Sequence, residues 1–346
     1  MMRSVAVVEP NRIELVHIPE PEPGPYEVRI KTEISYICNA TDRKLIEGHF
    51  PGVDTYPLLL GHESAGIVDA LGDKVSHFRV GQRVIGGLLL NTPDPSYGSG
   101  WGGMSEYVLA TDNRAMEEDG LSDPEHGWDE LYQVQRSVPS DISVEDAGLL
   151  CTWREVYAGF SDFQLIEGDD ILVFGAGPVG MSFVRFARLR GLGYIGCVDP
   201  VPEKREKALE LGADEAFSPD DQALQGLADK RGEKLDAVID AVGREEIINA
   251  SLPLLKMAGK TCVYGVIDKP VITVEKHAAP YNFNLLIHQW PTREWEAAAQ
   301  EPLCVWIGEG RLSYRDFLSG EYPVDDLQAA FDAVKSAVHV KTLLRW

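Results

Sequence analysis

Cysteine is scarce in this sequence, and long hydrophobic runs are absent. Only five of the 346 residues are cysteines, their number is odd, and no C-x-x-C pair occurs. A long chain with so few thiols does not carry a disulfide framework, which favours a reducing, cytoplasmic location. No apolar run approaches the roughly 20 residues that span a bilayer. The first residues, MMRSVAVVEPN, lack a signal-peptide cleavage pattern, so no membrane association is expected.

Basic residues are also in deficit. Lys and Arg total 32 against 55 Asp and Glu, which gives a formal net charge of −23. This balance argues against nucleic acids and anionic membranes as partners, because phosphate binding needs a basic surface. It favours a small-molecule partner but identifies none. The length indicates two domains, each large enough to bury its own core.

The pattern of the chain changes near residue 170. Residues 1–110 alternate short β-branched runs with Pro and Gly turns, which predicts a small barrel or sandwich. Residues 91–103 suggest an ordered loop, and the acidic residues 111–135 suggest a surface insertion. Beyond residue 170, apolar strands alternate with helical segments, which predicts βαβ units and a parallel sheet. The expected strands are 170–174, 194–198, 235–239 and 261–264.

A glycine-rich turn follows the first of these strands and opens a helix. Its glycines fit G-x-G-x-x-G, in which the backbone approaches a pyrophosphate that binds at the helix N-terminus. Asp199 ends the next strand, where a carboxylate accepts hydrogen bonds from ribose and repels a 2′-phosphate, which favours NAD over NADP. A tight structural turn with Asp199 capping a helix is the alternative. The proposed cofactor-binding residues are Gly175, Gly177, Pro178, Val179, Gly180, Asp199, Lys204 and Arg205.

Two cysteines and one histidine could form a metal site. Cys38 follows a strand-like stretch, His62 follows an apolar run, and Cys151 begins an expected helix. Two thiolates and an imidazole with an open fourth position suit a catalytic zinc ion. Taken singly, each residue is more often a core cysteine or a hydrogen-bonded histidine.

Four further motifs occur along the chain: Gly61-His62-Glu63 with Gly66 and Val68, Phe78 to Val84, Gly102 to Val108, and Leu255 to Lys260. Together they resemble the zinc-dependent medium-chain dehydrogenase/reductase family, which includes alcohol and polyol dehydrogenases. The resemblance covers nearly the whole chain and implies an α/β fold. A Rossmann doubly wound parallel sheet at 151–285 would accompany a GroES-like β-barrel catalytic domain at 1–150 and 286–346.

The resemblance also implies roles for residues around the metal. Cys38, His62 and Cys151 would bind zinc, with Glu63 as an auxiliary ligand. Asp42 would accept a hydrogen bond from His62, and Thr41 would contact the substrate oxygen and start a proton relay toward His49. The substrate pocket is expected between the domains, where Trp101, Trp153, His288 and Trp290 either line it or pack in the core.

Three departures from the family pattern affect these expectations. One extra residue separates Cys38 from Thr41 and Asp42, and Arg43 and Lys44 stand where a relay histidine is common. No cysteine lies between Cys38 and Cys151, so the four-cysteine structural zinc lobe is missing. One catalytic zinc per chain and no structural zinc are therefore expected.

The resulting hypothesis is a zinc-dependent oxidoreductase that transfers a hydride from a secondary alcohol to NAD. The alcohol would be a polyol, a sugar or a cyclic alcohol, and the family resemblance implies a homodimer or homotetramer. Two other hypotheses remain open: a zinc-free quinone- or enoyl-type reductase of the same family, and a non-catalytic NAD-binding protein.

Overall fold

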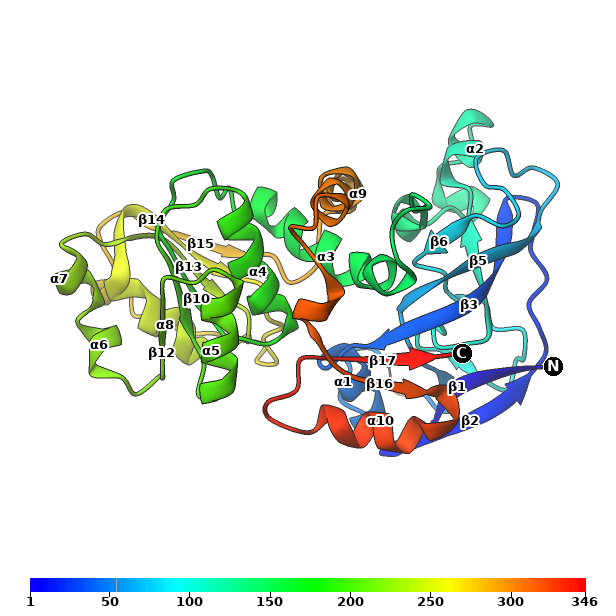
Figure 1. The fold of residues 1–346 in the computed structure, drawn as a ribbon, viewed down its shortest axis with the longest axis horizontal. Helices are drawn as coiled ribbons and strands as arrows, with labels where there is room; N and C mark the ends of the chain where they lie inside the picture. Colours follow the sequence, from blue (N-terminus) through cyan, green and yellow to red (C-terminus); the bar gives the residue numbers. More distant parts are fainter. Residues whose placement is uncertain (54) are drawn as a thin grey trace. The chain divides into compact units, whose positions relative to one another are not determined.

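The computed structural model describes residues 1–53 and 55–346, which form two compact units (Figure 1). The first unit comprises Met1–Thr152 and Gln300–Trp346, and the second comprises Trp153–Ala299. The chain passes between the units inside two helices, α3 (Val144–Asp162) and α9 (Arg293–Gly308). No described helix is long and apolar enough to cross a membrane.

The second unit contains a parallel six-stranded sheet in the order β12-β11-β10-β13-β14-β15. This order confirms the predicted doubly wound sheet. Helices α4 and α5 lie in front of these strands in Figure 1. The strands are β10 (Ile171–Phe174), β11 (Ile195–Val198), β12 (Glu215–Phe217), β13 (Leu235–Asp240), β14 (Leu255–Val263) and β15 (Asn284–Ile287). The helices wholly within this unit are α4 (Pro178–Leu189), α5 (Pro202–Leu211), α6 (Gln222–Gln225), α7 (Leu227–Arg231) and α8 (Glu245–Ser251), with η3 (Leu252–Leu254) and η4 (Lys276–Ala278).

Burial explains why the central strands of this sheet could be recognised. All four residues of β10 and all four of β11 are buried, as expected for parallel strands covered on both faces. The edge strands β12 and β15 are short and keep exposed or half-buried positions, so they lack a continuous apolar run.

The first unit contains two sheets, and the long strand β3 lies inside the larger one. The four-stranded sheet has the order β2-β1-β4-β7, and the larger sheet has the order β16-β17-β3-β5-β6-β9 with β8 also paired to β3. Its strands are β1 (Met2–Glu9), β2 (Arg12–Ile18), β3 (Glu27–Ile37), β4 (Leu58–Leu59), β5 (Glu63–Leu71), β6 (Arg83–Ile85), β7 (Gly98–Ser99), β8 (Tyr107–Thr111), β9 (Arg136–Ser137), β16 (Leu318–Pro323) and β17 (Lys341–Arg345). Its helices are α1 (Thr41–Glu47), α2 (Asn113–Glu118) and α10 (Leu327–Val334), with η1 (Pro124–His126), η2 (Glu130–Val134), η5 (Tyr314–Asp316) and η6 (Val324–Asp326).

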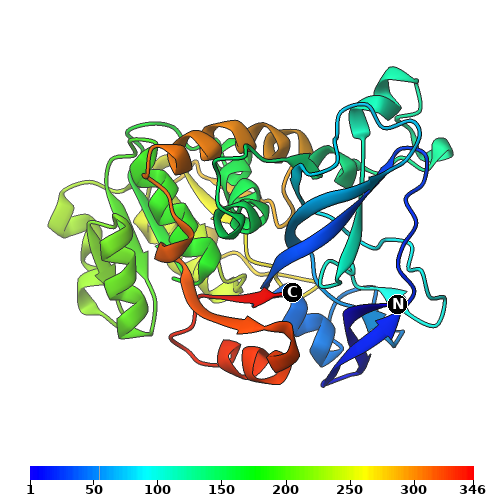
Figure 2. The same ribbon diagram turned by 45° about the vertical axis from the view of Figure 1, so that its right-hand side comes forward.

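The C-terminal strand completes the larger sheet of the first unit. β17 runs antiparallel to β3, with Thr342 opposite Ile37 (Figure 2). This pairing places Lys341, the first residue of β17, beside the end of β3, where Cys38 follows. The first unit is therefore discontinuous in sequence, as the family resemblance implies.

The second domain boundary differs from the expected position at residue 286. Strand β15 pairs with β14, and the first half of α9 belongs to the same unit, so the second unit extends to Ala299. The mixed pattern after residue 285 concealed this short strand. The first boundary falls between Thr152 and Trp153 rather than after residue 150.

Candidate active site

Paired strands bring the motif residues of the first unit together. Strands β3 and β5 are antiparallel, with Tyr36 opposite Glu63, so Cys38 just beyond β3 lies near His62 just before β5. Gly61 turns the chain into this position with a φ of 99°. A Cβ atom there would lie 2.3 Å from Cγ of Met104, so only glycine fits.

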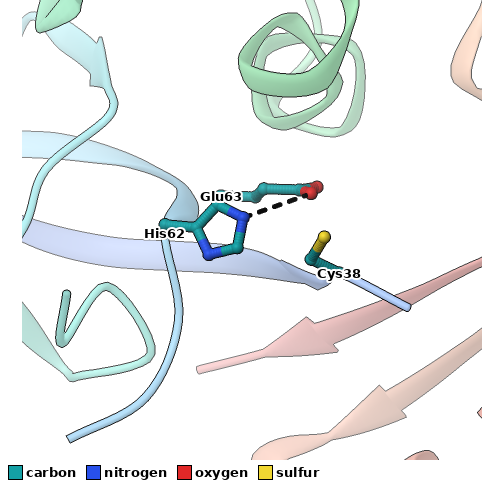
Figure 3. Close-up of side chains that lie close together, drawn as sticks. All are labelled: Cys38, His62 and Glu63. Carbon is teal, nitrogen blue, oxygen red and sulfur yellow. Dashed lines mark ion pairs between the residues drawn. The ribbon is translucent and has the colours of Figure 1, made fainter. Parts of the chain in front are cut away.

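Among the described residues, Cys38, His62 and Glu63 are the only group of His, Cys, Asp or Glu side chains whose ligand atoms lie close enough together to hold one metal ion (Figure 3). The Cys38 sulfur, a ring nitrogen of His62 and a carboxylate oxygen of Glu63 all lie within 4.8 Å of one another. Nε2 of His62 faces Oε1 of Glu63 at 3.9 Å. Thiolate, imidazole and carboxylate are the ligand types that zinc takes in proteins, so the donor set fits this ion.

Two buried polar atoms beside this group face each other without a hydrogen bond. Nδ1 of His62 and Oδ1 of Asp42 are 3.6 Å apart, and neither has a hydrogen-bond partner. The other Asp42 oxygen accepts a hydrogen bond of 2.8 Å from the backbone N–H of Cys38. Burial raises the pKa of Asp42 to about 7, against the opposing effect of His62. The extra residue after Cys38 therefore leaves Asp42 within reach of His62.

Lys341 is a member of this site that the sequence analysis missed. Its Nζ donates hydrogen bonds of 2.6 and 2.5 Å to the two carboxylate oxygens of Glu63, and both side chains are buried. Although burial alone lowers the pKa of Lys341, the charges of Glu63 and Cys38 raise it above its ordinary value. The only sequence signal was a lysine that opens an apolar C-terminal strand.

Cys38, His62 and Glu63 are named the metal-binding group after their donor atoms, and Cys151 lies outside this group. It is buried on α3, and its Sγ contacts the carbonyl oxygen of Ser64 at 3.9 Å. The structure thus groups Glu63, rather than Cys151, with Cys38 and His62. Since Ser64 directly follows Glu63, the Cys151 thiol still lies next to β5, the strand that begins with Glu63.

The other residues expected around the metal come from separate segments of the first unit. Thr41 is the half-buried first residue of α1, next to Asp42. His49 is exposed just beyond this helix, where its backbone N–H bonds the carbonyl of Lys44 at 2.8 Å. The Trp101 ring lies 5.6 Å from the His62 ring.

Three further residues expected to line the substrate pocket belong to the second unit. Trp153 is 1% exposed, so its ring packs in the interior, which fits the core alternative. Nδ1 of His288 lies 3.7 Å from Asp162, and its ring meets Phe163 edge-on. Trp290 is exposed, with the Arg293 guanidinium 5.0 Å from its ring centre.

The glycine turn of the second unit has the geometry of a dinucleotide-binding loop. Gly175 follows β10 with a φ of 93°. A Cβ atom on Gly180 would lie 1.7 Å from the carbonyl oxygen of Gly175, so the helix can approach the turn only with glycine here. Pro178 and Val179 begin α4, whose N-terminus follows Gly177. The free N–H groups and dipole of such a helix end bind phosphate.

Asp199 connects this turn to the end of β11. One carboxylate oxygen accepts a hydrogen bond of 2.7 Å from the N–H of Ala176, and the other accepts one of 2.9 Å from Val201. Arg205 donates to the carbonyl oxygens of Asp199 and Pro200, which ties it to the same strand end. Lys204 is half-buried on α5.

These features define a class of protein. A doubly wound sheet with a glycine turn and an acidic residue after the second strand binds a dinucleotide. The first unit holds a cysteine, a histidine and a glutamate where the paired strands β3 and β5 end and begin. Together they are typical of a metal-dependent nicotinamide oxidoreductase.

Comparisons with known proteins specify the family. Residues 24–119 match the alcohol dehydrogenase GroES-like domain, and residues 178–300 match the zinc-binding dehydrogenase domain. A sorbitol dehydrogenase from Bombyx mori is 26% identical over 96% of this chain and 95% of its own length. A probable cinnamyl alcohol dehydrogenase from Picea abies is 30% identical over 72% of this chain and 70% of its own length.

Solved structures share the fold. A short chain alcohol dehydrogenase from Escherichia coli CFT073, complexed with NADH, has a TM-score of 0.80 at 21% identity, covering 100% of this chain and 99% of the other. The chain belongs to the zinc-dependent medium-chain alcohol and polyol dehydrogenase family and is an oxidoreductase. The resemblance inferred from the motifs is confirmed.

Proposed function

We propose that this protein oxidises a secondary alcohol, namely a polyol, a sugar or a cyclic alcohol, with NAD as hydride acceptor and one zinc ion per chain. The observation that carries the proposal is the group of Cys38, His62 and Glu63 beside the partnerless atoms of His62 and Asp42. The grouped residues would hold the zinc, and the nearby Cys151 remains a further proposed ligand. The lack of any cysteine between Cys38 and Cys151 supports a single, catalytic zinc.

The residues of this chain have distinct proposed roles in the reaction. Zinc, when bound, supplies Lewis-acid polarisation that lowers the pKa of an alcohol hydroxyl, and bound NAD supplies the hydride acceptor. Asp42 accepts the Nδ1 hydrogen of His62, which fixes the tautomer that leaves Nε2 free as a ligand. Thr41 accepts the hydroxyl proton of the substrate and passes it toward His49, which is exposed to solvent.

The test of this function is NADH formation from a panel of primary alcohols, secondary alcohols and polyols, before and after zinc is removed with a chelator. The proposal expects secondary alcohols to be oxidised, and activity to disappear with the metal. Undiminished turnover of the metal-free protein would favour a zinc-free reductase. Cofactor binding without turnover of any alcohol would favour a non-catalytic NAD-binding protein.

We also propose that Asp199 makes the enzyme prefer NAD over NADP. The Asp199→Ala variant should lower the NAD-to-NADP ratio of kcat/KM by about 10- to 100-fold, the range expected for a lost charged hydrogen bond. The ratio is the useful quantity, because Asp199 also holds Ala176 and Val201, and that structural effect applies to both cofactors.

The Asp199→Asn variant is the matched control for the charge. It keeps an acceptor for the ribose but removes the repulsion of a 2′-phosphate, so its main expected effect is a gain with NADP. A cofactor ratio that is unchanged in both variants would eliminate the role assigned to Asp199.

The assembly and location of the enzyme are further proposals. The family resemblance supports a homodimer or homotetramer, and β15 ends its sheet with Ile287 exposed, which suits pairing with a second copy. The mass of a single protomer in light scattering would contradict this. No disulfide joins any of the five cysteines, all of which are among the described residues, and this supports a reducing compartment such as the cytoplasm. Secretion of the protein in its natural host would contradict that location.

A further inference from the structure

Trp101 has an unusual backbone conformation next to the metal-binding group. Its φ of 70° lies in the left-handed region, which is unfavourable for a residue other than glycine because the Cβ atom approaches the following carbonyl oxygen. The conformation is held on both sides: the Trp101 carbonyl accepts a hydrogen bond of 2.7 Å from Leu89, and its N–H donates to Ser99 Oγ at 3.1 Å. A strained backbone conformation that hydrogen bonds hold on both sides is typical of functional positions.

The strained backbone places the indole beside the candidate metal ligands. The Trp101 ring centre is 5.6 Å from that of His62 and 5.4 Å from that of Phe50, which meets it edge-on at 85°. Both aromatic side chains pack against the core cluster that contains Leu45 and Met104. Both are only half-buried, so part of their surface is accessible to a ligand.

We propose that Phe50 and Trp101 form an aromatic wall that receives the C–H face of a ring-shaped polyol, such as a pyranose or a cyclitol. This inference rests on the proposed alcohol oxidation and specifies its substrate class. The C–H groups of a polyol ring carry partial positive charge and meet the negative face of an indole favourably. A rigid ring presents this face without the loss of rotor entropy that an acyclic polyol incurs on binding.

The test compares kcat/KM for ring polyols, represented by myo-inositol and glucose, with kcat/KM for the acyclic polyol sorbitol. The zinc-loaded wild type should favour at least one ring compound. Trp101→Leu and Phe50→Leu should each lower the ring-to-acyclic ratio by about tenfold, mainly through KM, as expected for a lost aromatic contact of about 1.4 kcal/mol. Trp295→Leu, at a half-exposed tryptophan of the second unit, is the matched control and should leave the ratio unchanged.

A second readout is independent of turnover. A ring polyol should quench the indole fluorescence of the zinc-loaded wild type but not that of Trp101→Leu, with zinc content equal in both proteins. Wild-type preference for sorbitol, or an equal loss for all substrates in both variants, would overturn the inference while leaving the proposed oxidation intact. Failure of the wild type to oxidise any alcohol would remove both.

Discussion

The Cys38→Ser variant is expected to lose its bound zinc and at least about 1,000-fold in turnover. Cys38 supplies the only thiolate of the metal-binding group, and Lewis-acid stabilisation contributes several kcal/mol to such reactions. Each 1.4 kcal/mol corresponds to a factor of about ten in rate. Elemental analysis and NADH formation measure the two losses on the same sample.

The affinity for NADH separates a metal defect from general misfolding. The glycine turn and Asp199 belong to the second unit, so NADH should bind to Cys38→Ser within about threefold of wild type. Cys304→Ser is the matched control, because Cys304 lies on α9 and outside the metal-binding group. Wild-type zinc content and turnover in Cys38→Ser would show that the metal site has been misassigned.

The Lys341→Met variant is expected to destabilise the metal-free protein far more than the zinc-loaded one. Lys341 is the buried counter-charge of Glu63, and removing one partner of a buried ion pair typically costs about 3–5 kcal/mol. Bound zinc would supply positive charge to the same carboxylate and offset most of this loss. Denaturant unfolding with zinc and with chelator measures both free energies.

A double variant tests whether Lys341 acts through Glu63. In Lys341→Met/Glu63→Gln, neither charge is left unpaired, so the metal-free protein should recover most of the lost stability. Equal destabilisation of the two metal states by Lys341→Met would contradict the position of Glu63 at the metal. A double variant no more stable than Lys341→Met would show that Lys341 stabilises the fold through other contacts.

Much of the fold followed from local patterns in the sequence. The buried strands β10 and β11 and the glycine turn have continuous apolar residues and fixed spacing, and both were recognisable. Strand β15 was not, because it is four residues long and half-exposed at a sheet edge. The domain boundary was therefore placed before this strand ends, although its pairing with β14 assigns the whole strand to the second unit.

The site was predictable where a motif lies within one segment. His62 and Glu63 are adjacent in sequence, and Cys38 joins them through the pairing of β3 with β5. Lys341 could not be found in this way, because it reaches Glu63 from a strand 278 residues away. The spacing of residues in the sequence also could not show whether Glu63 or Cys151 lies closer to Cys38 and His62, because this depends on how α3 packs beside β5.

The dependence of turnover on the metal is measured most directly by returning zinc to chelated protein in steps while NADH formation from a secondary alcohol is followed. We predict no turnover without metal, a rate that rises in proportion to added zinc, and saturation at one zinc per chain. Full turnover of the metal-free protein, or a plateau reached only at two zinc ions per chain, would contradict a single catalytic zinc ion in each chain.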